Sequence, residues 1–385
     1  MSKTKQSSSS GSTKKSASKT AMRMKSNNVR WAIRGIAGEL LHNVFLRRVR
    51  KFLGNSKQIE EIKKVRLPIK NETAIVTGAT GGIGSKMACE LAFRGYDVII
   101  AARNADLGKD LVLSIQQELE KSSSVVKGET KQIPNISFME YHADVNRSAL
   151  DVASNLETLN KTKPITVLIN NAGIMGKSER LTMKVNVLGP VTLTLALLPL
   201  MMKNCNGDKS VKIINVSSSA HLRATGVFDE EDLGNESKSL MNIFPDNPDE
   251  DLSTYAKSKL ALLQFSTLLR HKLPKNKGIV QIFDCHPGLV WTPLLRNHLG
   301  DKATNTLQRT GLARLIYKTP TEGSQALLAS LDHPAGTNEE QLYFVNGVHG
   351  GYASPESRDI KQSQLLLERL IAPELEGILQ LPDGW

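Results

Sequence analysis

The stretch Thr77-Gly78-Ala79-Thr80-Gly81-Gly82-Ile83-Gly84 decides the fold of this chain. It follows a β-branched run over Thr73–Thr77 and precedes a helical pattern that reaches about Arg94. Glycine suits a backbone that turns tightly and approaches a pyrophosphate closely, and a helix that begins there directs free N–H groups at the phosphate. In this context the G-x-x-x-G-x-G spacing predicts a nucleotide-phosphate loop, with a flexible turn as the alternative.

Strand-like and helical patterns alternate along the rest of the chain. Runs typical of strands occur at Asp97–Ala101, Ile136–His142, Thr166–Asn170, Val211–Val216, Ile279–Asp284 and Gln341–Val345. Helical patterns lie between most of them, and this alternation predicts a parallel sheet with helices on both faces. We therefore expect one doubly wound α/β domain over residues 67–385.

The charge of the 385-residue chain is unevenly distributed. The net charge is +12, but residues 1–66 hold 17 Lys/Arg and 3 Asp/Glu, a net of +14, which leaves −2 for the other 319 residues. This nearly neutral body argues against a nucleic-acid partner. Three cysteines without C-x-x-C spacing argue against a disulfide framework or a zinc site, and they favour a reducing, intracellular compartment.

The basic N-terminal extension has two parts. Residues 1–30 are rich in Ser and Lys, which predicts a disordered tail, although an organelle-targeting peptide has a similar composition. In residues 31–66, apolar side chains recur at helical spacing over 31–53 with most of the arginines off this stripe, and a linker follows. This basic amphipathic helix fits a membrane surface, or equally a site on its own domain. The protein is thus expected to be cytoplasmic or membrane-associated.

The end of the second predicted strand indicates which dinucleotide binds. A carboxylate there would select NAD(H) by bonding the ribose 2′-hydroxyl, but the sequence reads Ala101-Ala102-Arg103-Asn104. Arg103 is available for a 2′-phosphate, and Asp97 lies at the wrong end of the strand. The pattern favours NADP(H) over NAD(H); the alternative is that Arg103 is a solvated surface cation.

A tyrosine and a lysine follow at helical spacing. In Tyr255-Ala-Lys-Ser-Lys259 the two side chains lie one turn apart on the same helix face, so the lysine cation can favour the phenolate. A phenol in that position can exchange a proton with an alcohol or carbonyl oxygen near neutral pH. Ser218 stands at the carboxyl end of a predicted strand, where ligands bind in such sheets.

Together these motifs resemble the short-chain dehydrogenase/reductase family of the Tyr-xxx-Lys type, over about residues 70–350. The likeness is carried by Thr77–Gly84, Asp144, Asn170, Asn171, Ala172, Gly173, Asn186, Ser218, Tyr255, Lys259, Pro287 and Gly288. It implies a Rossmann-like sheet, a nicotinamide cofactor, and alcohol–carbonyl interconversion. Homo-oligomers are common in this family.

Three stretches narrow the resemblance. Val216–His221, Tyr255–Leu263 and Ile316–Gly323 are similar to the retinol-dehydrogenase-like branch, near the dehydrogenase/reductase X-linked proteins. That branch acts on lipophilic substrates such as retinoids, steroids or polyprenoids. Its members often carry an N-terminal membrane anchor.

The resemblance also implies roles for single residues. Ser218 would orient the substrate oxygen and Tyr255 would transfer its proton. Lys259 would tune Tyr255 and hold the nicotinamide ribose, while Asn186 would anchor a proton-relaying water. Asp144 would contact the adenine and Thr292 the nicotinamide amide. The remaining cofactor-binding residues implied are Gly78, Thr80, Gly82, Ile83, Gly84, Asn171, Ala172, Gly173, Pro287 and Gly288.

Two segments depart from the family pattern, so the resemblance does not predict the shape of the substrate pocket. Residues 174–185 form a short connection, and residues 219–254 a long one with acidic clusters at 229–232 and 246–251. An NADP(H)-binding scaffold or sensor with little turnover, or an epimerase or dehydratase, remains an alternative function. His221 and His286 have no third partner at a catalytic spacing, and we interpret both as structural.

Overall fold

The computed structural model describes residues 68–123, 133–158, 163–203, 210–228, 252–273, 280–334, 343–345, 348–349, 353–382 and 385. The predicted tail over 1–30, the amphipathic helix over 31–53 and the linker to 66 lie outside the described residues. So do the acidic clusters at 229–232 and 246–251. These features remain predictions.

A single eight-stranded sheet forms the centre of the molecule, in the order β3-β2-β1-β4-β5-β6-β7-β8. The first seven strands pair in parallel and β8 pairs with β7 in antiparallel fashion. The strands are β1 (Thr73–Thr77), β2 (Asp97–Ala102), β3 (Ile136–Glu140), β4 (Ile165–Asn170), β5 (Val211–Val216), β6 (Val280–His286), β7 (Tyr343–Val345) and β8 (Val348–His349). This order confirms the predicted doubly wound α/β fold.

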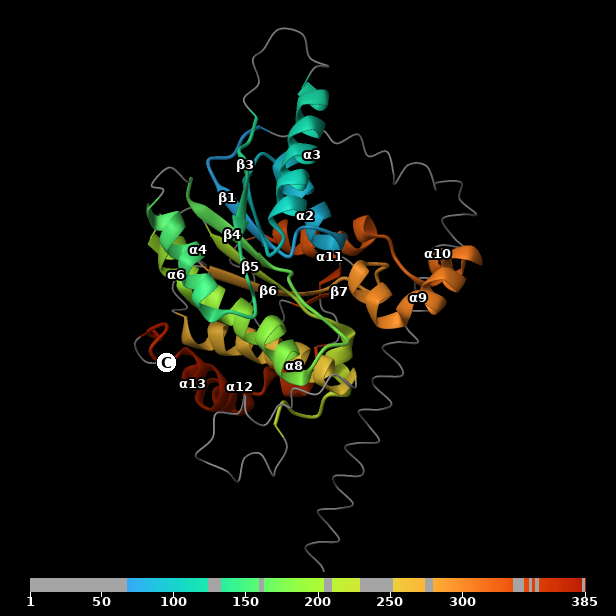
Figure 1. Ribbon diagram of the computed structural model, residues 1–385. Coiled ribbons are helices and arrows are strands. Elements are labelled where there is room, and N and C mark those ends of the chain that lie inside the picture. The colour runs from blue at the N-terminus through green and yellow to red at the C-terminus, as the bar shows by residue number, and fades with distance from the viewer. Residues whose placement is uncertain are drawn as a thin grey trace, which may run out of the picture.

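Helices cover both faces of the sheet (Figure 1). Helices α2 (Gly82–Phe93), α3 (Ala105–Ser123) and α11 (Pro320–Leu331) pack on one face, and α4 (Asn146–Thr158), α6 (Gly189–Lys203) and α8 (Leu252–Lys272) on the other. Side chains alternate between the faces, so Ala74 and Val76 join one apolar core and Ile75 joins the other. Two separate cores therefore hold the sheet from both sides.

Two strands end at residues other than those the sequence predicts. β3 stops at Glu140, two residues before the predicted end, because the chain then turns: the His142 amide donates to Ser148 Oγ at 3.0 Å. Conversely, β6 extends two residues beyond the predicted Asp284, to His286. The additional residues pair with β5 and β7. The strand therefore continues as far as the Pro287-Gly288 turn.

Shorter elements join the layers. They are α5 (Glu179–Met183), η1 (Lys184–Leu188), η2 (Ser219–Arg223), α9 (Pro293–Arg309), α10 (Leu312–Ile316), η4 (Pro355–Arg358), α12 (Ile360–Leu366), η5 (Leu367–Ile371) and α13 (Ala372–Leu375). The continuous helix Glu179–Lys203 is long and apolar enough to span a membrane, but 83% of its most apolar window is buried inside the fold. We therefore assign it to the protein core.

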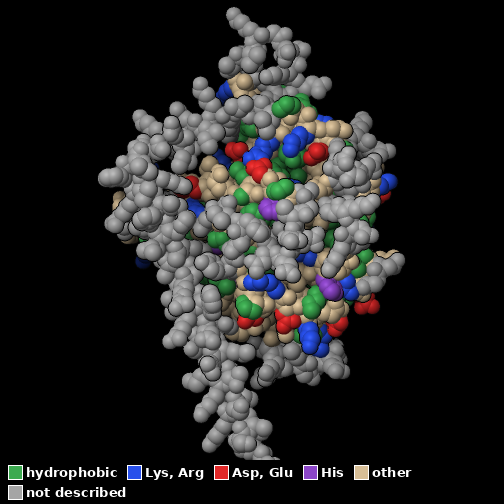
Figure 2. Space-filling model, turned by 180° about the vertical axis from the view of Figure 1, so that it is seen from behind, with side chains coloured by type: hydrophobic (Ala, Val, Ile, Leu, Met, Phe, Trp, Pro, Cys, Tyr) green, Lys and Arg blue, Asp and Glu red, His purple; other side chains and the backbone are tan. Residues whose placement is uncertain are grey.

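The described surface carries mixed charges. Figure 2 shows Lys and Arg side chains interspersed with Asp and Glu over the visible part of one face. Large apolar side chains that are exposed lie mostly apart, as with Val145 on the β3–α4 connection and Met202 on α6. Scattered exposed side chains of this kind are ordinary for a folded domain.

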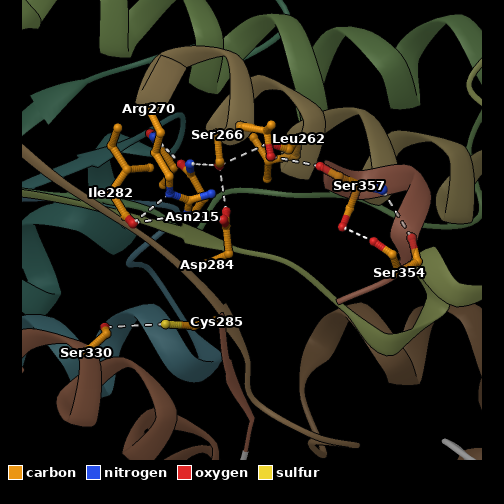
Figure 3. Close-up of polar contacts among 12 residues, drawn as sticks. Asn215, Leu262, Ser266, Arg270, Ile282, Asp284, Cys285, Ser330, Ser354 and Ser357 are labelled. Atoms are coloured by element: carbon orange, nitrogen blue, oxygen red, sulfur yellow. Dashed lines mark hydrogen bonds and ion pairs between the residues drawn. The ribbon is translucent and has the colours of Figure 1, made fainter. Parts of the chain in front are cut away.

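A buried polar network fastens α8 to the sheet (Figure 3). Asn215 on β5 is the register neighbour of Asp284 on β6, and its Nδ2 donates to Ser266 Oγ on α8 at 2.8 Å. Ser266 Oγ donates to Asp284 Oδ1 at 2.6 Å, and Arg270 Nη2 donates to Asp284 Oδ2 at 2.5 Å. Burial raises the pKa of the Asp284 carboxyl, and the Arg270 cation opposes this.

The network predicts a large effect of removing one charge. Arg270→Met leaves the Asp284 carboxylate buried without its cation, which should lower the free energy of unfolding by about 3–5 kcal/mol. Adding Asp284→Asn removes the uncompensated charge, so the double variant should recover much of that loss. Urea unfolding measures both. A single variant within about 1 kcal/mol of the parent would contradict the assigned pairing.

Candidate active site

The glycine loop adopts a conformation that requires glycine at two positions. Gly78 has φ +63° and Gly82 has φ +58°, both in the left-handed region. A Cβ on Gly78 would lie 2.7 Å from the Ala172 Cα. The N-cap residue of α2, Gly81, makes no side-chain capping bond, so the first N–H groups of this helix are left for an anion.

The segment after β4 holds this loop in place. Asn171 Nδ2 donates to the carbonyl oxygens of Thr77 at 2.9 Å and Gly78 at 3.1 Å. In return, Thr77 Oγ1 accepts from the Asn171 and Ala172 amides, both at 3.0 Å. A Cβ on Gly84 would lie 2.5 Å from Asn171 Nδ2. The side chain of Asn171 is thus directed at the loop backbone, and the absence of a side chain at Gly84 makes room for it.

Arg103 and Asp144, the residues predicted to bind the adenosine, follow β2 and β3. Arg103 is exposed directly after β2 and forms no ion pair with any described residue. Asp97, at the other end of the strand, is engaged with Lys163 Nζ at 2.9 Å. The Oδ1 atom of Asp144 is buried and has no hydrogen-bond partner among the described residues. Such a buried acceptor fits a donor from a bound group.

Tyr255 and Lys259 stand one turn apart on α8, and both are buried. Lys259 Nζ donates to the carbonyl oxygen of Val216, the last residue of β5, at 2.9 Å. It lies 5.7 Å from the centroid of the Tyr255 ring. Burial lowers the pKa of the Lys259 ammonium to about 8. A cation so poorly solvated interacts strongly with any nearby negative charge.

Ser218 follows β5 and caps the short helix η2. Its Oγ accepts a hydrogen bond from the Ala220 amide at 3.2 Å. The hydroxyl hydrogen is not used in that bond, so Ser218 can donate it to a ligand oxygen.

Asn186 connects the segment after β4 to α8. It lies in the π-helical turn η1 and is fully buried. Its Oδ1 accepts from the Ile174 amide at 2.8 Å, and its Nδ2 donates to the Ile174 carbonyl at 3.0 Å and to Ser258 Oγ at 3.0 Å. Ser258 Oγ in turn donates to the Tyr255 carbonyl at 2.8 Å. The short connection over 174–185 is therefore clamped to the tyrosine helix.

The segment after β6 lies beside the glycine loop. Gly288 has φ +85°, and the Leu289 carbonyl accepts from the Lys318 amide at 2.7 Å. Thr292 caps α9, and a Cβ on Gly82 would lie 3.3 Å from the Thr292 Cγ2. The predicted cofactor residues after β1, β4 and β6 thus lie at one edge of the sheet.

The sequence does not predict the contacts of His221, which its pattern indicates to be a structural residue. The ring is buried between the Ser218 backbone and Ser354, a residue 133 positions away. Its place three residues after Ser218 was visible in the sequence. Its partner was not, because nothing in the local pattern indicates which distant segment covers the turn.

Comparison with known proteins agrees with this geometry. The family model for short chain dehydrogenase matches residues 72–228. Dehydrogenase/reductase SDR family member 13 from Bos taurus is 30% identical over 316 residues, which cover 78% of this chain and 72% of that protein. The chain belongs to the short-chain dehydrogenase/reductase family. It is therefore an oxidoreductase of the dehydrogenase/reductase type.

Further relatives place this short-chain dehydrogenase/reductase in the retinol-dehydrogenase-like branch. Retinol dehydrogenase 13 and polyprenol dehydrogenase, both from Mus musculus, are 28% and 29% identical over 76% and 75% of the chain, and the matches cover 80% and 77% of those proteins. Dehydrogenase/reductase SDR family member FEY from Arabidopsis thaliana is 35% identical over 60% of the chain, but the match spans only 58% of that relative.

A solved structure supports the fold. Salutaridine reductase from Papaver somniferum is 18% identical to this short-chain dehydrogenase/reductase and superposes with a TM-score of 0.52. The alignment covers 71% of this chain and 99% of that one.

The desolvated Lys259 predicts a stability change with pH. Its pKa is about 8 in the folded protein, against 10.5 for an ordinary solvated lysine, so the unfolded chain binds more protons between these values. Stability should therefore rise with pH across this window in the cofactor-free protein, and this contribution should be absent in Lys259→Met. Urea unfolding from pH 7 to 11 measures it. Parallel curves for the two proteins would contradict the assignment.

Proposed function

We propose that the protein uses NADP(H) to interconvert a lipophilic alcohol and its carbonyl compound, with Tyr255 as the general acid and base. The observation that carries the proposal is the placement of Ser218, Tyr255 and Lys259 around the end of β5. Ser218 follows the end of β5 with a hydroxyl hydrogen free to donate, and Lys259 of the buried Tyr255–Lys259 pair binds the Val216 carbonyl at that end, which lies at the same sheet edge as the glycine loop.

The chain's own residues fit a dinucleotide. The uncapped start of α2 suits a pyrophosphate, the buried Asp144 Oδ1 suits an adenine amino group, and Arg103 suits a 2′-phosphate. A bound nicotinamide supplies or accepts the hydride. The residues proposed to hold the cofactor are Gly78, Thr80, Gly82, Ile83, Gly84, Arg103, Asp144, Asn171, Ala172, Gly173, Tyr255, Lys259, Pro287, Gly288 and Thr292.

Proton handling falls to the residues around Tyr255. Ser218 donates its hydroxyl hydrogen to the substrate oxygen and so orients it toward the phenol. In reduction, Tyr255 gives its proton to the developing alkoxide, and in oxidation it takes the proton of the alcohol. The Lys259 cation stabilises the phenolate that forms, and burial strengthens this interaction. Asn186 keeps the Ile174 segment against α8.

The lipophilic substrate class is supported by relatives and by side chains after β6. The relatives include proteins named retinol dehydrogenase and polyprenol dehydrogenase. Trp291 is half-buried and its ring lies 5.1 Å from that of Tyr317, with Leu294 and Leu295 following at the start of α9. These apolar side chains begin next to the Thr292 cap. They provide a surface for the body of a hydrophobic alcohol.

Replacing the phenol tests the mechanism. Tyr255→Phe keeps the buried ring but removes the proton, so kcat on an active retinoid or polyprenoid substrate should fall by about 100-fold to 10,000-fold. The Kd for NADPH, measured by fluorescence titration, should rise far less than kcat falls, because the other proposed cofactor contacts are kept. Full turnover by this variant would refute Tyr255 as the acid and base. If the parent protein forms an isomerised product without net change in NADPH absorbance, it is an epimerase instead.

Replacing the arginine tests the cofactor preference. Arg103→Ala should weaken NADPH binding by about 10- to 100-fold, the size of a charge-assisted hydrogen bond, and leave NADH binding unchanged. Thermal unfolding with each nucleotide measures this as a smaller shift of the midpoint. Lys361→Ala removes an exposed cation on α12 and serves as the control. Equal loss of NADPH and NADH binding would contradict the role of Arg103.

A further inference from the structure

His221 joins two segments that the mechanism above leaves unconnected. It lies in η2 and its side chain is completely buried. Its Nδ1 lies 2.6 Å from the Ser218 carbonyl oxygen, and its Nε2 lies 3.2 Å from the Ser354 amide nitrogen. The ring also packs edge-to-face on Tyr343, with 5.6 Å between centroids. The turn that carries Ser218 is thus attached through His221 to the segment around Ser354.

The two contacts fix the protonation state of the ring. A backbone amide can only donate, so Nε2 accepts from Ser354 and carries no hydrogen. A carbonyl oxygen can only accept, so Nδ1 carries the hydrogen and donates it to Ser218. His221 is therefore neutral in one defined tautomer. Burial, aided by the nearby His286 and opposed by the Ser218 bond, lowers its pKa to about 4, in agreement with a neutral ring.

The segment that holds Nε2 is itself fastened to the tyrosine helix. Gln264 Nε2 on α8 donates to the Glu356 carbonyl at 3.1 Å, and Thr267 Oγ1 donates to the Ser357 carbonyl at 2.8 Å. Within the segment, Ser357 Oγ donates to the Ser354 carbonyl at 2.6 Å, a contact visible in Figure 3. The same helix carries Tyr255, so a continuous chain of bonds runs from α8 through η4 and the imidazole to the backbone of Ser218.

We propose that His221 is a positioning residue for the reaction: through the Nδ1–H bond to the Ser218 carbonyl, it sets the serine hydroxyl relative to Tyr255. The inference rests on the proposed function of Ser218 and Tyr255. Ser218 Oγ is oriented from its other side by the Ala220 amide, so the carbonyl bond supplies a second fixed point for the same residue. Without it, the turn can rotate while the fold stays intact.

Two substitutions separate the two ring contacts. In His221→Asn, the side-chain amide nitrogen can take the place of Nδ1 and keep the bond to Ser218. In His221→Gln, the amide reaches the place of Nε2, so the Ser354 contact is kept and the Ser218 bond is lost. A purely structural role predicts that activity follows stability in both. A positioning role predicts that only the glutamine variant loses kcat disproportionately.

The first experiment measures kcat, KM and thermal midpoint for both variants. We expect kcat of His221→Gln to fall at least about tenfold below that of His221→Asn at similar midpoints, the effect of one hydrogen bond. The KM for NADPH should be the same in both. His271→Gln, an exposed histidine on the same helix as Tyr255, is the control and should match the parent. Equal kcat in the two His221 variants, or losses that follow the midpoints, would overturn the proposal.

A second measurement does not depend on turnover. With ¹⁵N-labelled histidine, NMR should show His221 neutral with hydrogen on Nδ1 from pH 5 to 8. The Ala220 amide should exchange with solvent faster in His221→Gln than in His221→Asn, since it reports the Ser218 turn. An imidazole that titrates near pH 6.5, or equal exchange, would overturn the inference. If the parent protein turns over no substrate, the proposed function fails and these spectra still decide the placement of His221.

Discussion

The arrangement of this protein depends on how α8 is attached to the central sheet. A helix that only packs apolar side chains on a sheet can slide by small steps, whereas the bonds from Ser266 and Arg270 to Asn215 and Asp284 allow one register. The network lies one residue before Val216 on β5 and directly before Cys285 on β6. It therefore fixes the ends of two strands together with the helix that carries Tyr255 and Lys259.

Within that frame, hydrogen bonds between side chains and the backbone connect each part of the site to a neighbour. Asn171 holds the glycine loop, Asn186 holds the Ile174 peptide, and Lys259 binds the end of β5. Amide side chains suit this task because they donate and accept at once, and because leaving one unpaired inside a protein is costly. In the proposed mechanism, these bonds surround the residues that handle the proton. The site is more open along α9, which in the described residues contributes no buried side chain.

The sequence predicted the sheet well because buried parallel strands are continuous apolar runs, as in β1 and β4. The helical spacing of Tyr255 and Lys259 and the turn at the glycine loop also follow from local sequence, whereas the roles of these residues stay predictions. The sequence could not predict that Asp284 is buried, since a carboxylate in a strand pattern normally indicates a solvent-facing position. Nor could it predict the π-helical turn at Asn186 or the partner of His221. Each of these features involves contacts between segments that are distant in the sequence, and local periodicity does not predict such contacts.

The bond between His221 and Ser354 has a consequence for synthesis of the protein. The two residues are 133 positions apart, so at about 5–20 residues per second roughly ten seconds pass between their appearances on the ribosome. The residues of all eight strands, the glycine loop and the helix that carries Tyr255 are synthesised before Ser354. The nascent chain can therefore begin to assemble the sheet and the glycine loop early. The turn that carries the serine acquires its final support only when the last part of the chain is translated.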